Sequence, residues 1–154
     1  MIDPTDYGSG EPVDIQIDVY GLRTFTVSGG QLGSIVKGAG HWKGGVCTAR
    51  CLMTEHKPPA DECACGIYAC HSLRGLFGQY SEFASRIVAV IVAEGDTVVG
   101  DMGLRTSAAR IVAYWCADGQ PAAVLRVCAE QCPDARRFRS LKLMTRMFGL
   151  GGFE

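Results

Sequence analysis

The sequence predicts an α+β protein: a small, mostly antiparallel β domain with a metal-stapled loop and one or two C-terminal helices. Short apolar segments separated by glycine-rich turns occupy residues 13–116, which is the pattern of a β-rich domain. Clear helical spacing follows them in 122–154. Cysteine and histidine residues crowd a proline-containing stretch, 47–71. A length of 154 residues suits a single domain with one core.

The composition is that of an ordinary globular protein, with 47% hydrophobic residues, 20% charged residues and a net charge of −1. This balance gives no global reason to expect a nucleic-acid-binding or membrane protein. The longest apolar run, 87–93, is far too short to span a bilayer as a helix. The acidic N-terminus lacks the basic and apolar regions of a signal peptide. We therefore expect a cytoplasmic protein, in which the eight cysteines favour free thiols over a disulfide framework.

The predicted elements of the first half are short. Residues 1–12 are polar and rich in Gly and Pro, and are expected to be a flexible leader. Apolar and polar residues alternate in 13–20, as in a strand that is buried on one face. Glycine-rich turns separate further predicted strands at 23–30, 31–36 and 46–53.

Two stronger strands are predicted in the second half. Residues 86–95 are apolar on both faces, as in a central strand, and 109–116 resemble them. A short strand and a turn are expected between the two. Residues 66–80 are ambiguous, because apolar residues recur at helical spacing while Gly75 and Gly78 each weaken a helix by about 1 kcal/mol.

Helices are predicted at the C-terminal end. Residues 122–132 have helical spacing and complete a single β-rich domain that spans 13–132. Residues 133–154 are predicted to form a basic amphipathic helix, with Pro133 in its first turn, where proline is tolerated.

The stretch 47–71 holds two close pairs of candidate zinc ligands around a Pro-Pro kink. Cys51-x4-His56 precedes the kink, and Cys63-x-Cys65 follows it. Zn²⁺ favours four thiolate or imidazole ligands in a tetrahedron, which two pairs joined by a loop can supply. The prolines restrict the loop, so less entropy is lost when a metal closes it. The predicted metal ligands are Cys51, His56, Cys63 and Cys65.

Other interpretations of these residues stay open. The thiols could form a reversible disulfide or another redox centre, or could simply fill space in the core. Cys47, Cys70 or His71 could replace one ligand, and the last two could form a catalytic pair. The spacings of zinc deaminases and of His-Glu-x2-His enzymes are absent. Core packing is the expectation for Cys47, Cys116, Cys128 and Cys132.

The C-terminal segment carries more basic than acidic residues. Residues 126–154 contain six Lys or Arg residues against three acidic ones. These cations could contact an acidic protein or a nucleic-acid backbone. The alternative is the solvated face of a packed amphipathic helix. The candidate partner-binding residues are Arg136, Arg137, Arg139, Lys142 and Arg146.

Two other features favour a structural over a functional interpretation. The glycine-rich stretches 28–34 and 37–45 lack the Gly-x4-Gly-Lys-Ser/Thr pattern of phosphate-binding loops, so they are expected to form turns. Arg105, in a predicted turn, is expected to form a structural salt bridge with Asp101 or Asp96, or to be a free surface charge.

One motif resembles a known group of proteins. The runs Trp42-x2-Gly45, Ala49-x-Cys51, His56-x2-Pro59, Cys63-x-Cys65-Gly66-Ile67-Tyr68-Ala69 and Gly103-x-Arg105 resemble small uncharacterised proteins of actinobacteria and their phages. The resemblance covers roughly residues 20–115. It implies ligand roles for Cys51, His56, Cys63 and Cys65, and implies no activity. The sequence departs from the group in 87–100, which lacks its Gly-x-Val-x-Leu-Trp-Gly run.

Three functions are consistent with these features. The first is a non-enzymatic, zinc-stabilised interaction module of phage origin that binds a host protein. The second is a metal- or cysteine-dependent hydrolase or redox enzyme, although no acid/base pairing is recognisable. The third is a nucleic-acid-binding protein that uses the basic C-terminal helix. None of the three calls for a membrane.

Overall fold

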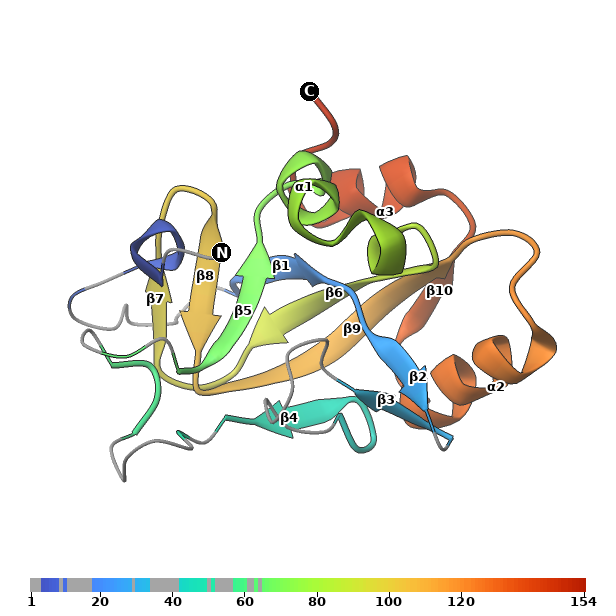
Figure 1. Ribbon diagram of the computed structural model, residues 1–154, viewed down its shortest axis with the longest axis horizontal. Helices are drawn as coiled ribbons and strands as arrows, with labels where there is room; N and C mark the ends of the chain where they lie inside the picture. The colour runs from blue at the N-terminus through green and yellow to red at the C-terminus, as the bar shows by residue number, and fades with distance from the viewer. Residues whose placement is uncertain are drawn as a thin grey trace.

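The computed structural model describes residues 4–8, 10, 18–28, 30–33, 42–49, 51, 57–60, 63 and 65–154. Within them the chain forms a mostly antiparallel β-sheet with three α-helices, which confirms the predicted α+β class (Figure 1). No helix in this part of the chain is long and apolar enough to cross a membrane.

The main sheet has eight strands, seven of them in the order β10-β9-β6-β1-β5-β8-β7. The eighth, β4, pairs with the first residues of β9, and β10 pairs with later residues of the same strand. Every pair in the described sheet is antiparallel except β10 with β9. The strands are β1 (Tyr20–Arg23), β4 (Val46–Thr48), β5 (Ile67–Cys70), β6 (Ile87–Ala93), β7 (Thr97–Val99), β8 (Gly103–Thr106), β9 (Ala108–Cys116) and β10 (Arg136–Phe138). A separate hairpin joins β2 (Thr26–Ser28) to β3 (Gln31–Gly33).

The central strand β6 divides the core between the two faces of the sheet. All seven of its residues are buried, as its apolar sequence predicts. Because successive side chains of a strand point to opposite faces, Ile87, Ala89 and Ile91 join one hydrophobic cluster, and Val88 and Val90 join the other. The sheet is therefore covered on both sides.

Helices cover both faces. Side chains of α1 (Leu73–Ala84) and α3 (Leu141–Met147) pack in the cluster that contains Val88. Side chains of α2 (Ala122–Gln131) and of the β2–β3 hairpin pack in the cluster that contains Ile87. Figure 1 shows α1 and α3 together on one side of the sheet, with α2 near the hairpin on the other.

The ambiguous segment 66–80 is divided between a strand and a helix. β5 ends at Cys70, and Ser72 then caps α1 by accepting a hydrogen bond from the backbone N–H of Gly75 at 3.0 Å. The helix is interrupted at Tyr80, whose backbone angles are not helical. The helical spacing of apolar residues in 66–80 therefore corresponds to a helix only from Leu73 onward.

The C-terminal segment differs from the single helix predicted over 133–154. Arg136–Phe138 form β10, which extends the sheet along the second half of β9. Ser140 then starts α3 as an N-cap, with its hydroxyl 3.1 Å from the N–H of Leu143. Pairing with a strand distant in sequence outweighs the local helical pattern, and the helix is reduced to 141–147.

The N-terminal segment also differs from the flexible leader predicted over 1–12. Pro4–Tyr7 form a 3₁₀ helix, η1, and Tyr7 is only 1% exposed. Its ring packs edge-on against Tyr68, with centroids 5.1 Å apart. Residues 4–8 therefore belong to the packed domain. The rest of the predicted leader, apart from Gly10, and most of the predicted strand 13–20 lie outside the described residues.

Candidate metal centre

Three cysteine thiols meet at one end of the sheet. The Sγ atoms of Cys51, Cys63 and Cys65 all lie within 4.8 Å of one another. The Cys51 and Cys63 sulfurs are 3.6 Å apart. In a tetrahedral zinc site with Zn–S bonds of about 2.3 Å, neighbouring sulfurs lie about 3.8 Å apart. The three thiols could therefore hold a metal ion with little movement.

Backbone hydrogen bonds and strand pairing position the chain segments that carry these thiols. Ala49 donates a backbone hydrogen bond to the Ser107 carbonyl at 2.7 Å just before Cys51, and Cys63 donates one to the Ala60 carbonyl at 3.2 Å. Cys65 lies two residues before the start of β5, which pairs with β8. The sheet and its loops, rather than a helix, set the spacing of the sulfurs.

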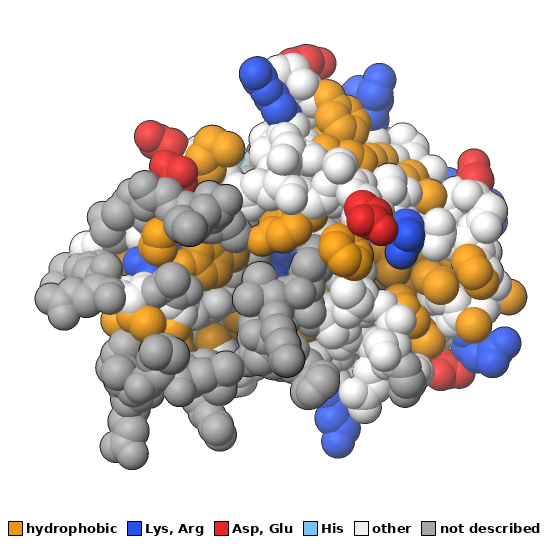
Figure 2. All heavy atoms as spheres, in the orientation of Figure 1, with side chains coloured by type: hydrophobic (Ala, Val, Ile, Leu, Met, Phe, Trp, Pro, Cys, Tyr) orange, Lys and Arg blue, Asp and Glu red, His pale blue; other side chains and the backbone are white. Residues whose placement is uncertain are grey.

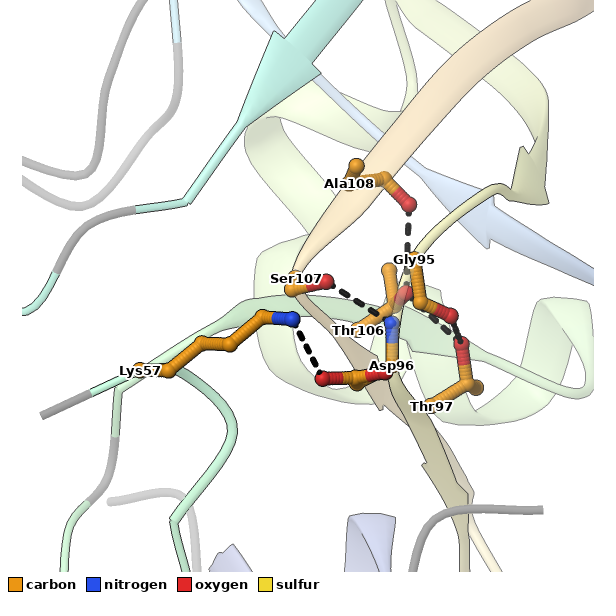
Figure 3. A network of polar contacts seen from close by, with 7 residues as sticks. All are labelled: Lys57, Gly95, Asp96, Thr97, Thr106, Ser107 and Ala108. Atoms are coloured by element: carbon orange, nitrogen blue, oxygen red, sulfur yellow. Dashed lines mark hydrogen bonds and ion pairs between the residues drawn. The ribbon is translucent and has the colours of Figure 1, made fainter.

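An ion pair fixes the proline-containing loop to the neighbouring turn. Lys57 Nζ lies 2.8 Å from Asp96 Oδ2 (Figure 3). The turn is braced in its own right: Asp96 donates its backbone N–H to the Ser107 hydroxyl at 2.8 Å, and the Thr97 and Thr106 hydroxyls are 2.7 Å apart. The loop therefore contacts a hydrogen-bonded turn, through an ion pair whose two side chains are both exposed.

Burial opposes the negative charge that a metal needs on these sulfurs. Burial, opposed by a backbone hydrogen bond involving Ala60 and assisted by the neighbouring Cys63 and Cys51 thiols, raises the pKa of the Cys65 thiol to about 11. Cys65 is therefore protonated at neutral pH in the absence of metal. A divalent cation would displace this proton, since zinc binds the thiolate.

The structure distinguishes these thiols from the other cysteines. All eight cysteines are described, and none forms a disulfide. Cys47, Cys116, Cys128 and Cys132 are buried in one hydrophobic cluster, as core packing predicts. Cys70 lies in the other cluster, with its sulfur 3.5 Å from the Tyr7 hydroxyl. Neither Cys70 nor Cys47 belongs to the described group of candidate ligands. The remaining predicted ligand, His56, lies outside the described residues.

Arg105 is the main residue at this site that the sequence did not reveal. Both expectations for Arg105, a salt bridge with Asp96 or Asp101 and a free surface charge, are wrong. Arg105 lies in β8 and is 1% exposed, and none of the ion pairs among the described residues includes it. Its Nη1 donates to the carbonyls of Cys63 at 2.7 Å and of Ala60 at 3.2 Å. The one sequence signal for this residue was its place in the Gly-x-Arg part of the motif.

The same guanidinium reaches the N-terminal segment. Nε and Nη2 of Arg105 donate to the Gly8 carbonyl at 3.2 Å and 2.8 Å. Burial raises the pKa of the adjacent Tyr68, while the charge of Arg105 and its hydrogen bond to the phenol oppose that rise. Arg105 thus joins the loop of Cys63 to residues 4–8.

The five predicted partner-binding cations are all exposed but do not form one stripe. Arg136 lies over the Phe138 ring, with its Cζ 4.4 Å from the ring centroid, on the α3 side of the sheet. Arg137 follows on the strand and so faces the other way. There, burial raises the pKa of Tyr114, and the charge of Arg137 opposes part of that rise. Lys142 and Arg146 are one turn apart on α3, and Arg139 lies between β10 and α3.

On the face shown in Figure 2, the described residues form no large cluster of like-charged side chains. Charged side chains of the described residues are scattered there among hydrophobic and neutral ones.

Comparisons with protein-family models, with curated proteins and with solved structures gave no match.

Proposed function

We propose that this protein is a non-enzymatic interaction module stabilised by one structural zinc ion. The observation that carries the proposal is the convergence of Cys51, Cys63 and Cys65, from two separate chain segments, to within 4.8 Å. Thiolates select thiophilic metals, of which zinc is the usual choice in closed structural sites. The sequence offers His56 as the fourth ligand.

A structural role fits the surroundings better than a catalytic one. Catalytic zinc keeps an open position for water and needs a group that can move protons. The described candidate group consists of thiols alone, with no carboxylate or imidazole among its members. The neighbouring Arg105 donates hydrogen bonds to the backbone carbonyls of Ala60 and Cys63 and so stabilises the loop. A metal at this point would lock the loop onto the sheet.

Metal analysis of the purified full-length chain tests the zinc. We expect about one zinc per chain after purification without added metal, and sulfur-dominated coordination in the X-ray absorption spectrum at the zinc edge. Protein that contains no zinc, takes up none on addition and has freely titrating thiols would contradict the proposal.

We further propose that the partner is a protein with an acidic surface, bound on the outer face of α3. Leu143 and Met147 are 43% and 54% exposed there, one turn apart. Lys142 and Arg146 adjoin them on the helix, and Arg136 Nη1 lies 3.8 Å from Met147 Sδ. Exposed apolar groups rimmed by one sign of charge fit a surface of opposite charge. The resemblance to phage proteins extends this proposal to a host protein.

Reversing the charge of the helix tests this surface. Lys142→Glu with Arg146→Glu should weaken binding of an affinity-captured partner at least tenfold without changing the melting temperature by more than about 2 °C, because both side chains are exposed. Arg74→Glu with Arg126→Glu makes the same charge change at exposed positions on α1 and α2, and should leave binding intact.

The same variants address the nucleic-acid alternative. If a random-sequence duplex of about 20 base pairs binds the wild type with a steep salt dependence, and the helix variant loses that binding, nucleic acid replaces protein as the partner. Equal binding of the protein partner by the wild type, the helix variant and the control pair would overturn a role for α3.

A further inference from the structure

Arg105 is a buried cation whose hydrogen bonds to the described residues all go to neutral groups. It is 1% exposed, and its guanidinium donates to three backbone carbonyls, those of Gly8, Ala60 and Cys63. None of the ion pairs among the described residues includes it. Carbonyl dipoles replace only part of the hydration that a buried charge loses, so such a cation is usually stabilised by an anion nearby.

The thiol group supplies that anion when it holds a metal. Three thiolates on a divalent cation carry a net charge of about −1, whatever neutral ligand completes the site. Arg105 is bonded to the carbonyl of Cys63, which is itself a candidate ligand, at 2.7 Å. The guanidinium is therefore placed where a negative metal centre and a buried cation offset each other.

We propose that Arg105 is the positioning residue and the counter-charge of the metal centre, and that it couples metal binding to the packing of residues 4–8. This inference rests on the proposed zinc site. Ligand-orienting groups outside the first coordination sphere typically change metal affinity by about 10–100-fold. The guanidinium meets this description because one side of it holds the loop at Ala60 and Cys63 and the other holds Gly8.

The coupling is reciprocal. Whatever the packed N-terminal segment adds to zinc affinity, zinc must add to the packing of that segment. Tyr7, buried against Tyr68, is the side chain that fixes the segment, and Gly8 is the residue that Arg105 binds. Zinc addition is therefore expected to slow amide hydrogen exchange in residues 5–8, although none of them is a candidate ligand.

Two glycines give a matched test at a distance from the metal. Gly8 and Gly10 both have positive φ, 109° and 89°, so alanine strains the backbone at either position. A Cβ on Gly8 would lie 2.6 Å from the backbone of Val98, whereas a Cβ on Gly10 meets nothing within 4 Å. Gly8→Ala should therefore displace the carbonyl that Arg105 binds, and Gly10→Ala should not.

The experiment measures zinc affinity by competition with a chromophoric chelator, using full-length protein whose folding is checked by circular dichroism. Arg105→Met should weaken zinc at least tenfold. Arg105→Lys should fall between it and the wild type, because lysine keeps the charge but not the fork that reaches three carbonyls. Gly8→Ala should weaken zinc several-fold and Gly10→Ala should leave it unchanged.

The outcomes separate this inference from the zinc site itself. A wild type that binds no zinc overturns both. Tight binding by the wild type, with Arg105→Met within threefold of it or Arg105→Lys as weak as Arg105→Met, overturns the role of Arg105 alone. If Arg105→Met fails to fold, equal zinc affinities for Gly8→Ala and Gly10→Ala overturn the coupling.

Discussion

Cys63→Ser is expected to reduce the bound zinc from about one per chain to nearly none and to lower the melting temperature by about 10 °C. Serine oxygen is a poor zinc ligand, and the substitution replaces the Cys63 sulfur, which is one of the three candidate ligand atoms. Zinc held at 100 to 1,000 times its dissociation constant stabilises a fold by about 3–4 kcal/mol. For a chain of this size each kcal/mol corresponds to about 2–4 °C. Calorimetry and elemental analysis measure the two effects.

The loss of structure in Cys63→Ser should be confined to the metal-binding loop at 25 °C. Neither hydrophobic cluster of the sheet includes Cys51, Cys63 or Cys65, so the core does not depend on the metal for its packing. Far-ultraviolet circular dichroism of Cys63→Ser at 25 °C should therefore stay close to that of the wild type. Proteolysis between residues 50 and 66 should become faster, because the loop loses its tether.

Cys47→Ser is the matched control. It makes the same chemical change in the same part of the chain, at a thiol that is buried in the core and lies outside the candidate ligand group. It should lower the melting temperature by placing a hydroxyl in an apolar site, yet keep the full zinc content. If both variants kept their zinc, Cys63 would not be a ligand. If both variants lost their zinc, the loss would come from a general disturbance of the fold and not from removal of a ligand.

The strongest sequence signals produced the best-placed elements. The apolar run predicted at 86–95 is β6 at Ile87–Ala93, and the strand predicted at 109–116 is β9 at Ala108–Cys116. The helix predicted at 122–132 is α2 at Ala122–Gln131. In each case one local pattern, burial on both faces or a helical stripe, decides the structure without reference to distant residues.

Elements that depend on distant partners were not predictable in this way. β4 covers only the first half of β9, so the second half is free to pair with Arg136–Phe138, a tripeptide with no strand signal of its own. The same holds for Arg105, whose carbonyl partners lie 42, 45 and 97 residues away along the chain. Cysteine spacing, by contrast, is local in sequence, and it predicts Cys51, Cys63 and Cys65 as ligands without reference to the fold.

Gly103→Ala is expected to destabilise the protein by about 3 kcal/mol, and so to lower the melting temperature by about 6–12 °C. Gly103 lies on β8 opposite Cys70, where an added Cβ would come within 1.9 Å of the Ala69 carbonyl oxygen and 2.8 Å of the Tyr7 ring. Neither neighbour can yield cheaply, because one is backbone in the middle of the sheet and the other is a buried ring. Thermal unfolding monitored by circular dichroism measures the change.

Gly78→Ala provides the control with the opposite sign. Gly78 lies in α1 and is exposed, and an added Cβ there meets nothing within 4 Å. Alanine should stabilise the helix by about 1 kcal/mol, raising the melting temperature by about 2–4 °C. Equal effects of the two substitutions would contradict the close approach of β8 to Tyr7. Because Gly103→Ala acts through backbone contacts, its penalty should persist when a chelator removes zinc, whereas that of Cys63→Ser should vanish.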